Sequence, residues 1–298
     1  MSDETLGLYK KAGRILASAL KKARYKVHVG MPLTELCDLV EYEIKVGGAE
    51  PAFPCNVSIN NIAAHDTADI NDERTIPPNS IVKIDGGAHI EGYIVDSAIT
   101  VSFDPSYERL LLAAQKALLN ALEVIKPGTS LREIGKTVEH TIRNYGYKPI
   151  SNLTGHQISR YVLHAGKIIP NVYSFLEHGE VLEGEIYAIE PFATNGRGEV
   201  HDLNYARIYA LLSKPKKIND EVDELATKIW NERKGLPFTP RWYLKDYNNI
   251  KRLIDEMLKK RIAMKYPVLT EINNSYVSQF EHTIYVTKDG VLSFTEID

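Results

Sequence analysis

The sequence predicts an α+β fold made of two similar halves, with a helical segment inserted into the second half. Three observations support this prediction. Residues 9–51 resemble residues 107–149, runs typical of β-strands follow both stretches, and residues 213–265 are polar with helical spacing. We therefore expect one duplicated domain, residues 1–212 with 266–298, and an inserted helical subdomain, residues 213–265.

The internal repeat can be counted directly. Shifting residues 9–51 by 98 positions lays them on residues 107–149 without a gap, and twelve of the 43 pairs are identical. Average residue usage gives about three identities. Any two amphipathic helices share Leu and Ala, but Gly, Glu and Pro also match here in register. These matches are Gly30/Gly128, Glu35/Glu133, Glu41/Glu139, Gly48/Gly146 and Pro51/Pro149. The repeat indicates a duplication about a pseudo-twofold axis, with sites expected between the halves.

Each half is expected to begin with two helices. Residues 9–23 carry apolar side chains at helical spacing, and a second helix is expected from Pro32, at its first position, to the glycines 47–48. In the second half, residues 107–125 form the matching helix. The next helix opens at Ser130, where a glutamate three residues later completes a capping box.

Strands are expected to follow the helices in each half. Residues 80–87 and 185–190 are rich in β-branched side chains, and a turn over residues 87–92 leads into a strand at 94–101. Residues 278–294 are typical of a closing hairpin.

The predicted insertion differs from the rest of the chain. Residues 214–265 are polar with helical spacing, interrupted by a break from Pro237 to Pro240. A long helix is expected to begin at Pro240 and to run toward Met264. The segment is also basic, with 14 Lys and Arg against 8 Asp and Glu, although the whole chain has a net charge of −3.

Composition excludes several classes of protein. Of the 298 residues, 44% are hydrophobic and 25% are charged, which excludes a wholly disordered or fibrous chain. A net charge of −3 argues against binding nucleic acid over the whole surface. Cys37 and Cys55 cannot build a disulfide framework. No signal peptide and no run of 18 apolar residues is present in the sequence, so we expect a cytoplasmic protein with no membrane partner.

Four carboxylates interrupt apolar runs that are predicted to be strands. Asp85 follows Ile84 in one strand, Asp96 lies in the next, and Glu190 and Glu281 repeat the pattern in the second half. Burying a carboxylate is costly unless it is paired or binds a metal. A cluster of four needs cations, and with one imidazole it forms the ligand set of a two-metal site. His156 is the best candidate for that imidazole, because Gly155 beside it permits close approach.

These residues and their neighbours resemble a known family. The motifs that carry the resemblance are Ile84-Asp85-Gly86-Gly87, Asp96-Ser97-Ala98, Gly155-His156, Ile189-Glu190-Pro191-Phe192 and Gln279-Phe280-Glu281-His282-Thr283. Together they resemble the methionine aminopeptidases over essentially the whole chain. That family has the pita-bread fold with pseudo-symmetric halves, which agrees with the counted repeat.

The type 2 branch of the family is the closer match. It resembles this chain in Ala63-Ala64-His65-Asp66, in His164-Ala165-Gly166-Lys167, and in a helical insertion between the fourth and fifth ligands. The long polar N-terminal extension of eukaryotic type 2 enzymes is absent from this sequence. The chain therefore resembles the short archaeal form.

The resemblance implies a role for each candidate ligand. Asp85 would hold one divalent metal ion, Asp96 and Glu281 would bridge two, and His156 with Glu190 would hold the other. The two ions could be Co, Mn, Fe or Zn, since carboxylate-rich sites tolerate each. A metal-bridged hydroxide would attack the first peptide carbonyl. Glu190 would also carry protons as a catalytic residue.

The resemblance also implies a substrate, the initiator methionine of nascent proteins whose second residue is small. His65 and His164, 99 positions apart, would contact the substrate peptide from opposite halves, and His65 would act in catalysis. His201, Phe53 and Tyr266 match positions beside the substrate pocket. The expected partners are nascent polypeptide N-termini, with ribosome contact through the basic insertion, and the family implies a monomer.

Two alternatives stay open at the level of sequence. X-Pro dipeptidases and aminopeptidase P share the fold and the five-ligand pattern, but they carry a separate domain before the catalytic one. Only 84 residues precede Asp85, and the first half of the repeat needs them. The other alternative is a non-catalytic binding protein of the same fold, which would be expected to have lost ligands.

Overall fold

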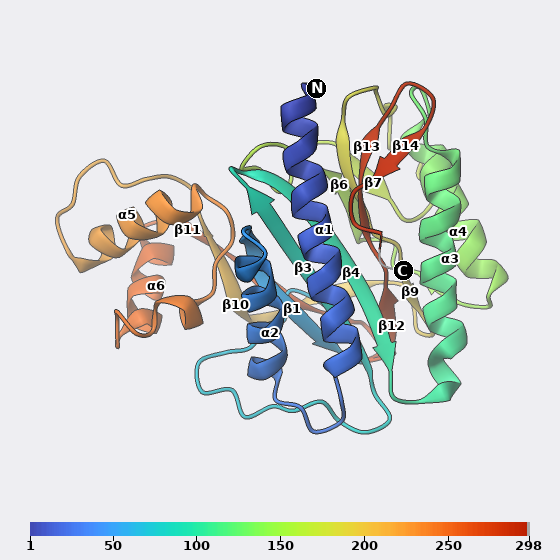
Figure 1. Cartoon of the computed structure of the whole chain (residues 1–298). Coiled ribbons are helices and arrows are strands. Elements are labelled where there is room, and N and C mark those ends of the chain that lie inside the picture. Colours follow the sequence, from blue (N-terminus) through green and yellow to red (C-terminus); the bar gives the residue numbers. More distant parts are fainter. Residues whose placement is uncertain (297–298) are drawn as a thin grey trace.

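The computed structural model describes residues 1–296 and confirms the predicted α+β class (Figure 1). In the first half, two helices cover a sheet with the strand order β1–β3–β4. These elements are α1 (Asp3–Lys26), α2 (Leu33–Val46), β1 (Glu50–Ile59), β3 (Ile81–Ile90) and β4 (Tyr93–Ser102). The Ser2 hydroxyl caps α1 by accepting the N–H of Thr5. Leu16 and Leu20 of α1 are fully buried.

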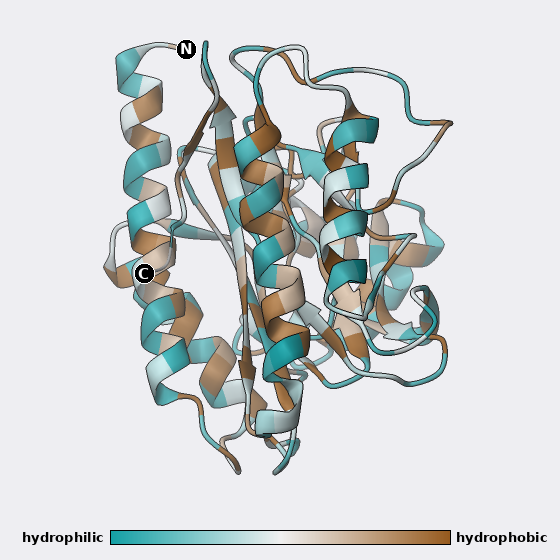
Figure 2. Ribbon diagram, turned by 90° about the vertical axis from the view of Figure 1, so that its right-hand side faces the viewer, coloured by the Kyte–Doolittle hydropathy of each residue, from teal (hydrophilic) through white to brown (hydrophobic). Residues whose placement is uncertain are grey.

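The second half repeats this helix–helix–strand order. A short 3₁₀ helix, η1 (Pro105–Tyr107), leads into α3 (Glu108–Val124), α4 (Leu131–Asn144) and β5 (Lys148–Pro149). Ser130 caps α4 at the N–H of Glu133, as the sequence predicts. The helices alternate apolar and polar residues, as expected for elements covered on one face (Figure 2).

Two sheets lie behind α3 and α4. Their orders are β12–β9–β5 and β14–β13–β8–β6–β7. The strands are β6 (Thr154–Gln157), β7 (Ile168–Pro170), β8 (Ile186–Ile189), β9 (Phe192–Thr194), β12 (Val277–Gln279), β13 (His282–Val286) and β14 (Val291–Ser293). Each half of the molecule has its own apolar core, and Phe280 packs against both.

A fourth sheet connects the halves to the insertion. Its order is β10–β11–β2, formed by β10 (Val200–Leu211), β11 (Ala263–Glu271) and β2 (Ile62–Ala64). The chain between β10 and β11 holds α5 (Glu221–Arg233), η2 (Pro240–Tyr243) and α6 (Ile250–Lys259), which project to one side in Figure 1. These elements bury a separate apolar cluster around Leu225, Leu253 and Met257.

Several local predictions need correction. Pro32 is the N-cap of α2 rather than its first residue. β3 continues to Ile90, so the turn to β4 is only Glu91-Gly92, both with positive φ as a type I′ hairpin turn requires. The expected long helix from Pro240 is a 3₁₀ turn followed by the shorter α6.

The predicted C-terminal hairpin is real but interrupted. β13 pairs with β14 around the expected turn, but β12 belongs to a different sheet. Glu190 and Glu281 therefore lie at the breaks between β8 and β9 and between β12 and β13, and not within strands as the sequence suggests. None of the helices within residues 1–296 is long and apolar enough to cross a membrane.

Candidate metal centre

Asp85 and Asp96 lie on the same face of one sheet. In the β3–β4 ladder, Gly87 is opposite Asp96 and Asp85 is opposite Ala98. Since alternate residues of a strand share a face, the two carboxylates are diagonal neighbours. Ordinary strand geometry therefore brings together two acids that are eleven positions apart in the sequence.

Glu281 and Glu190 reach the same place because the chain changes sheets at both residues. Glu281 forms an isolated bridge with Ala98, its N–H donating to the Ala98 carbonyl at 3.0 Å. The next residue, His282, pairs with Ile189, directly before Glu190. The breaks that end β8 and β12 thus direct two glutamates toward the aspartates of the first half.

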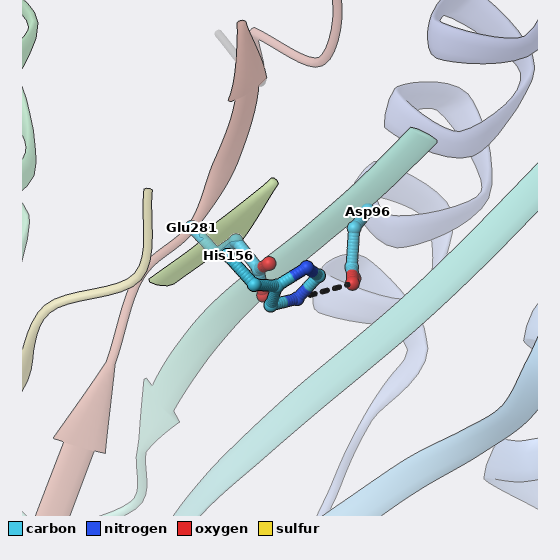
Figure 3. A group of neighbouring side chains, drawn as sticks. All are labelled: Asp96, His156 and Glu281. Carbon is cyan, nitrogen blue, oxygen red and sulfur yellow. Dashed lines mark ion pairs between the residues drawn. The ribbon is translucent and has the colours of Figure 1, made fainter. Parts of the chain in front are cut away.

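His156 completes the group from β6, where it pairs with Ala188 of β8. Its Nε2 lies 3.6 Å from Asp96 Oδ2 and 3.7 Å from Glu190 Oε1. Ligand atoms of Asp96, His156 and Glu281 all lie within 4.8 Å of one another (Figure 3). The structure therefore brings all five predicted ligands together, from five segments of chain in both halves.

Sequence reasoning missed one member of this group, Gln279. It is buried, and its Nε2 lies 3.5 Å from both Asp85 Oδ2 and Glu190 Oε2 and 3.4 Å from Glu281 Oε2. A spacing of two residues from Glu281 along an extended strand places both side chains on one face. The two-residue spacing from Glu281 was therefore the signal in the sequence that could have identified Gln279. An amide is an ordinary neighbour for a crowded carboxylate cluster.

Electrostatics sets this cluster apart from an ordinary buried network. Burial raises the pKa of Asp85 to about 7, and burial followed by repulsion from the other acids raises the pKa values of Asp96 and Glu281 well above normal. Burial lowers the pKa of His156 to about 3, so this imidazole is neutral. Four carboxylates beside a neutral imidazole form a site that favours cations.

The polar atoms of the cluster fit divalent metal ions. Asp85 Oδ1, Asp96 Oδ1 and Glu281 Oε1 are buried without a hydrogen-bond partner. Within residues 1–296, no Lys or Arg forms an ion pair with any of the four acids. Carboxylate oxygens with one imidazole nitrogen are donors that Mn, Fe, Co and Zn accept.

The sequence matches metallopeptidase family M24 over residues 7–288. The chain belongs to metallopeptidase family M24. A protein of Saccharolobus solfataricus called methionine aminopeptidase is 43% identical over 300 residues, covering 99% of each chain.

Two solved structures show the same M24 fold. One is a thermophilic Arx1, with a TM-score of 0.84 at 18% identity, covering 99% of this chain and 91% of the other. The second is a methionine aminopeptidase from Thermotoga maritima, with a TM-score of 0.73 at 22% identity, covering 99% and 98%. These two likenesses support the pita-bread architecture.

A partly open cavity lies beside the candidate ligands of the M24 chain. Its lining includes four of the five residues predicted to bind substrate. All five candidate ligands line it as well, and the remaining lining residues are Phe53, Asn56, Ala64, His65, Leu163, His164, Ile208, Pro237 and Tyr266. The wall is mostly apolar away from the acids, which suits an unbranched thioether side chain.

His65 and His164 face the cavity from opposite halves, as their spacing suggests. The His164 ring centroid lies 4.4 Å from that of His156, and the His65 ring packs edge-on to Tyr266 at 5.5 Å. Burial lowers the pKa of His65 to about 4 and also lowers the pKa of His164. Both imidazoles are therefore neutral near pH 7 and can act as hydrogen-bond donors or acceptors.

His65 has an unusual backbone conformation. Its φ is +64°, and its Nδ1 lies 3.2 Å from the carbonyl of Pro267. Left-handed backbone is uncommon at residues other than Gly, although His adopts it more often than most, and it recurs at functional sites. The conformation is held by Ala64 in β2 on one side and by the buried Asp66 on the other.

His201 does not join this group. It lies on β10 opposite Thr270 and is exposed, and it is not among the residues that line the cavity. The charge of the adjacent Asp202 raises the pKa of His65, against the larger lowering by burial. Ile208 and Pro237 line the cavity instead, although nothing in their sequence context distinguishes them from core residues.

Proposed function

We propose that this chain removes the N-terminal methionine from proteins whose second residue is small. The observation that carries the proposal is one cavity in which five candidate metal ligands adjoin an apolar wall. Membership of metallopeptidase family M24 and 43% identity to a protein called methionine aminopeptidase support it.

The five ligands suit two divalent ions. Asp85 would hold one, Asp96 and Glu281 would bridge both, and His156 with Glu190 would hold the second. When bound, such ions lower the pKa of a water and polarise the carbonyl that is attacked. The unpaired carboxylate oxygens of Asp85, Asp96 and Glu281 support metal binding by these three residues.

The chain's own residues position the peptide. Neutral His65 and His164 would donate hydrogen bonds to the substrate on either side of the scissile bond, where charge develops on the carbonyl oxygen. Glu190 would hold the proton that passes to the leaving amine. Phe53 and Tyr266 would enclose the methionine side chain, and the acidic cluster would attract the free α-amine.

An assay with short peptides tests the proposal. With Mn²⁺ or Co²⁺, the chain should cleave Met-Ala-Ser but not its N-acetylated form, and not an X-Pro dipeptide. Glu281→Ala should abolish cleavage, since it removes a bridging ligand. Cleavage of the X-Pro dipeptide alone would support the prolidase alternative, and full activity of Glu281→Ala would contradict the two-metal arrangement.

The short archaeal type 2 form is the branch that we propose. The inserted segment between Glu190 and Glu281 supports it, and we propose residues 1–212 with 266–298 and 213–265 as the two structural units. In the structure β11 begins at Ala263, three residues before the proposed boundary.

Type 2 relatives accept Val and Thr at the second residue, so Met-Val and Met-Thr peptides should be cleaved.

The basic insertion supports a ribosome contact. Near the outer end of the β10–β11 pair, Lys214 donates to Asn231 of α5, and the backbone of Leu212 bonds Ile262, next to Arg261. Such a cationic surface would favour RNA near the exit of nascent chains, and we expect a cytoplasmic monomer there. Co-sedimentation with ribosomes at low salt, lost at high salt and in Lys214→Glu with Arg261→Glu, tests this proposal.

A further inference from the structure

Arg233, the last residue of α5, is a buried cation without an acidic partner. Its side chain is only 6% exposed, and no carboxylate within the described residues 1–296 forms an ion pair with it. Its guanidinium carbon lies 4.9 Å from the ring centroid of Trp242. An unpaired buried charge is costly, so its other contacts must offset that cost.

Those contacts are three backbone carbonyls. Arg233 Nη2 donates to Pro51 O at 2.8 Å, to Ala52 O at 3.0 Å and to Pro237 O at 3.1 Å. The first two belong to β1 of the catalytic half and the third to the loop of the insertion. One guanidinium nitrogen therefore joins two parts of the chain that are almost 190 positions apart.

The β1 carbonyls face Arg233 where the β1–β3 ladder is irregular. Pro51 pairs with Ala88 and Phe53 with Gly87, so Ala52 is an extra residue, as in a β-bulge. A second irregularity follows between Phe53 and Asn56. Bulges change the direction of side chains. These two irregularities lie on either side of Phe53, which lines the cavity.

Both segments of chain that Arg233 joins, β1 and the loop of the insertion, adjoin the cavity wall. Phe53 follows Ala52 directly, and Pro237 itself lines the cavity, whereas Arg233 does not. The position of Phe53 is also tightly limited, since a Cβ on Gly87 would lie 2.3 Å from its Cε1. The hydrogen bonds of Arg233 thus join the chain next to Phe53 to Pro237, on two sides of the cavity wall.

We propose that Arg233 is a positioning residue that sets the width of the pocket for the first side chain of the substrate. The proposal rests on the proposed function, because it takes this pocket to hold methionine. Arg233 would act through Phe53 and Pro237, so its loss should change which first residue is accepted. The insertion would then be part of the specificity apparatus.

Arg241 provides a matched control. It also lies in the insertion and joins it to the first half, through ion pairs to Asp38 and Glu41 of α2. Neither Arg241 nor these partners lines the cavity. A general loosening of the insertion should therefore follow from changing either arginine, while a change in specificity should follow only from Arg233.

The experiment compares kcat/KM for Met-Ala-Ser and Leu-Ala-Ser in the metal-loaded full chain. In Arg233→Met, the Met/Leu ratio should fall about tenfold, the scale of one altered contact in a hydrophobic pocket. Most of the loss should appear as a higher KM for Met-Ala-Ser. Arg233→Lys, which keeps three donors, should restore most of the ratio, and Arg241→Met should lower the Tm with an unchanged ratio.

The outcomes separate the two proposals. A wild-type chain that cleaves neither peptide overturns the proposed function, and the inference falls with it. A wild-type chain that prefers methionine, with an unchanged ratio in Arg233→Met, overturns the inference alone. If Arg233→Met does not fold, Arg233→Gln decides, because its shorter, neutral side chain has only two N–H donors for the three carbonyls. A Met/Leu ratio and a KM identical to those of the wild type in Arg233→Gln would overturn the inference.

Discussion

At the scale of single residues, the lack of a side chain at Gly87 matters for the wall of the cavity. It lies opposite Asp96 in the ladder, and a Cβ there would come within 2.3 Å of Phe53 Cε1 and 2.7 Å of Cδ1. The added Cβ would also lie 3.0 Å from the Cβ of Ala52. The second glycine of the Asp85-Gly86-Gly87 motif therefore makes room for the cavity wall.

We predict that Gly87→Ala displaces Phe53 and damages the pocket. The free energy of unfolding should fall by about 1–3 kcal/mol, which is typical of overpacking, and kcat/KM for Met-Ala-Ser should fall at least about tenfold. Gly7→Ala is the control, since a Cβ at Gly7 meets nothing within 4 Å. Chemical unfolding and peptide kinetics would measure both effects. Wild-type kinetics in Gly87→Ala would contradict this account of the motif.

A second residue, His89, couples folding to pH. Burial, followed by the charge of Arg233, lowers its pKa to about 4, and its Nδ1 accepts the N–H of Gly92 in the β3–β4 turn. An unfolded histidine titrates near 6.5, so between pH 6.5 and 4 the unfolded chain binds more protons. The contribution of His89 is complete above pH 6.5 and is lost as the pH falls toward 4.

Replacing His89 should therefore reduce the fall in the free energy of unfolding as the pH is lowered. We expect the wild type to lose up to about 3 kcal/mol more than His89→Asn between pH 7.5 and pH 4. Urea unfolding at a series of pH values measures the difference, and asparagine keeps an acceptor for Gly92. Parallel curves for the two proteins would show that His89 does not titrate in this range.

At the scale of elements, the two glutamates of the candidate centre lie where strands end. Glu190 separates β8 from β9 and Glu281 separates β12 from β13, so neither side chain is committed to a regular ladder. Each break lets a carboxylate point toward β3 and β4 of the other half. The second half thus contributes two carboxylates at strand ends, whereas Asp85, Asp96 and His156 lie within strands.

We predict opposite effects of Glu281→Gln without and with metal. Without metal, removing one of four mutually repelling acids should raise the Tm at pH 8. In the wild type, Mn²⁺ at about 100 times its Kd should add about 2.7 kcal/mol, and Glu281→Gln should lose this gain. Scanning calorimetry checks both.

Glu271→Gln is the control for this prediction. Glu271 is fully buried outside the cavity, and its carboxylate accepts the N–H groups of Asn273 and Ser275. Its replacement should lower the Tm and leave the gain with Mn²⁺ unchanged. An undiminished Mn²⁺ gain in Glu281→Gln would contradict its role as a ligand.

Most helices and strands could be predicted from the sequence, but where they end depended on the elements that they pair with or pack against. The helices of both halves follow from apolar spacing. The glycines at 86 and 87 suggested an early end for β3, yet the strand continues to Ile90 because β4 pairs with it throughout. Within the insertion, periodicity suggested one long helix. The chain instead turns after Tyr243, since η2 and α6 pack separately on one small core.

At the scale of the whole molecule, the repeat explains why the site could be anticipated. Asp85 and Asp96 come from the first half, and His156, Glu190 and Glu281 from the second, so the ligands meet only when the halves close together. Motif order was enough to propose these five. Arg233 could not be found in the same way, because its partners are backbone carbonyls and leave no pattern in the sequence.

The last prediction concerns how the halves respond together to metal. A ligand that binds only the folded state suppresses every opening that breaks its site, and amide exchange reports such openings unit by unit. We expect Mn²⁺ to slow exchange in β3, β4, β6 and β13, which hold or adjoin candidate ligands from both halves. Helices α5 and α6 contribute no candidate ligand and have their own apolar core, so their local openings should be unaffected.

Hydrogen exchange with and without Mn²⁺ measures this pattern, with Glu281→Gln as the variant that should show no slowing. Slowing in one half only would mean that the ions are held by that half alone, which contradicts a site shared across the pseudo-twofold axis. Equal slowing in α5 and α6 would show that the insertion opens only together with the rest of the chain. Slowing confined to the two halves would support a catalytic unit whose halves are held together by the bound ions. The insertion, which has its own apolar core, would then open independently of that unit.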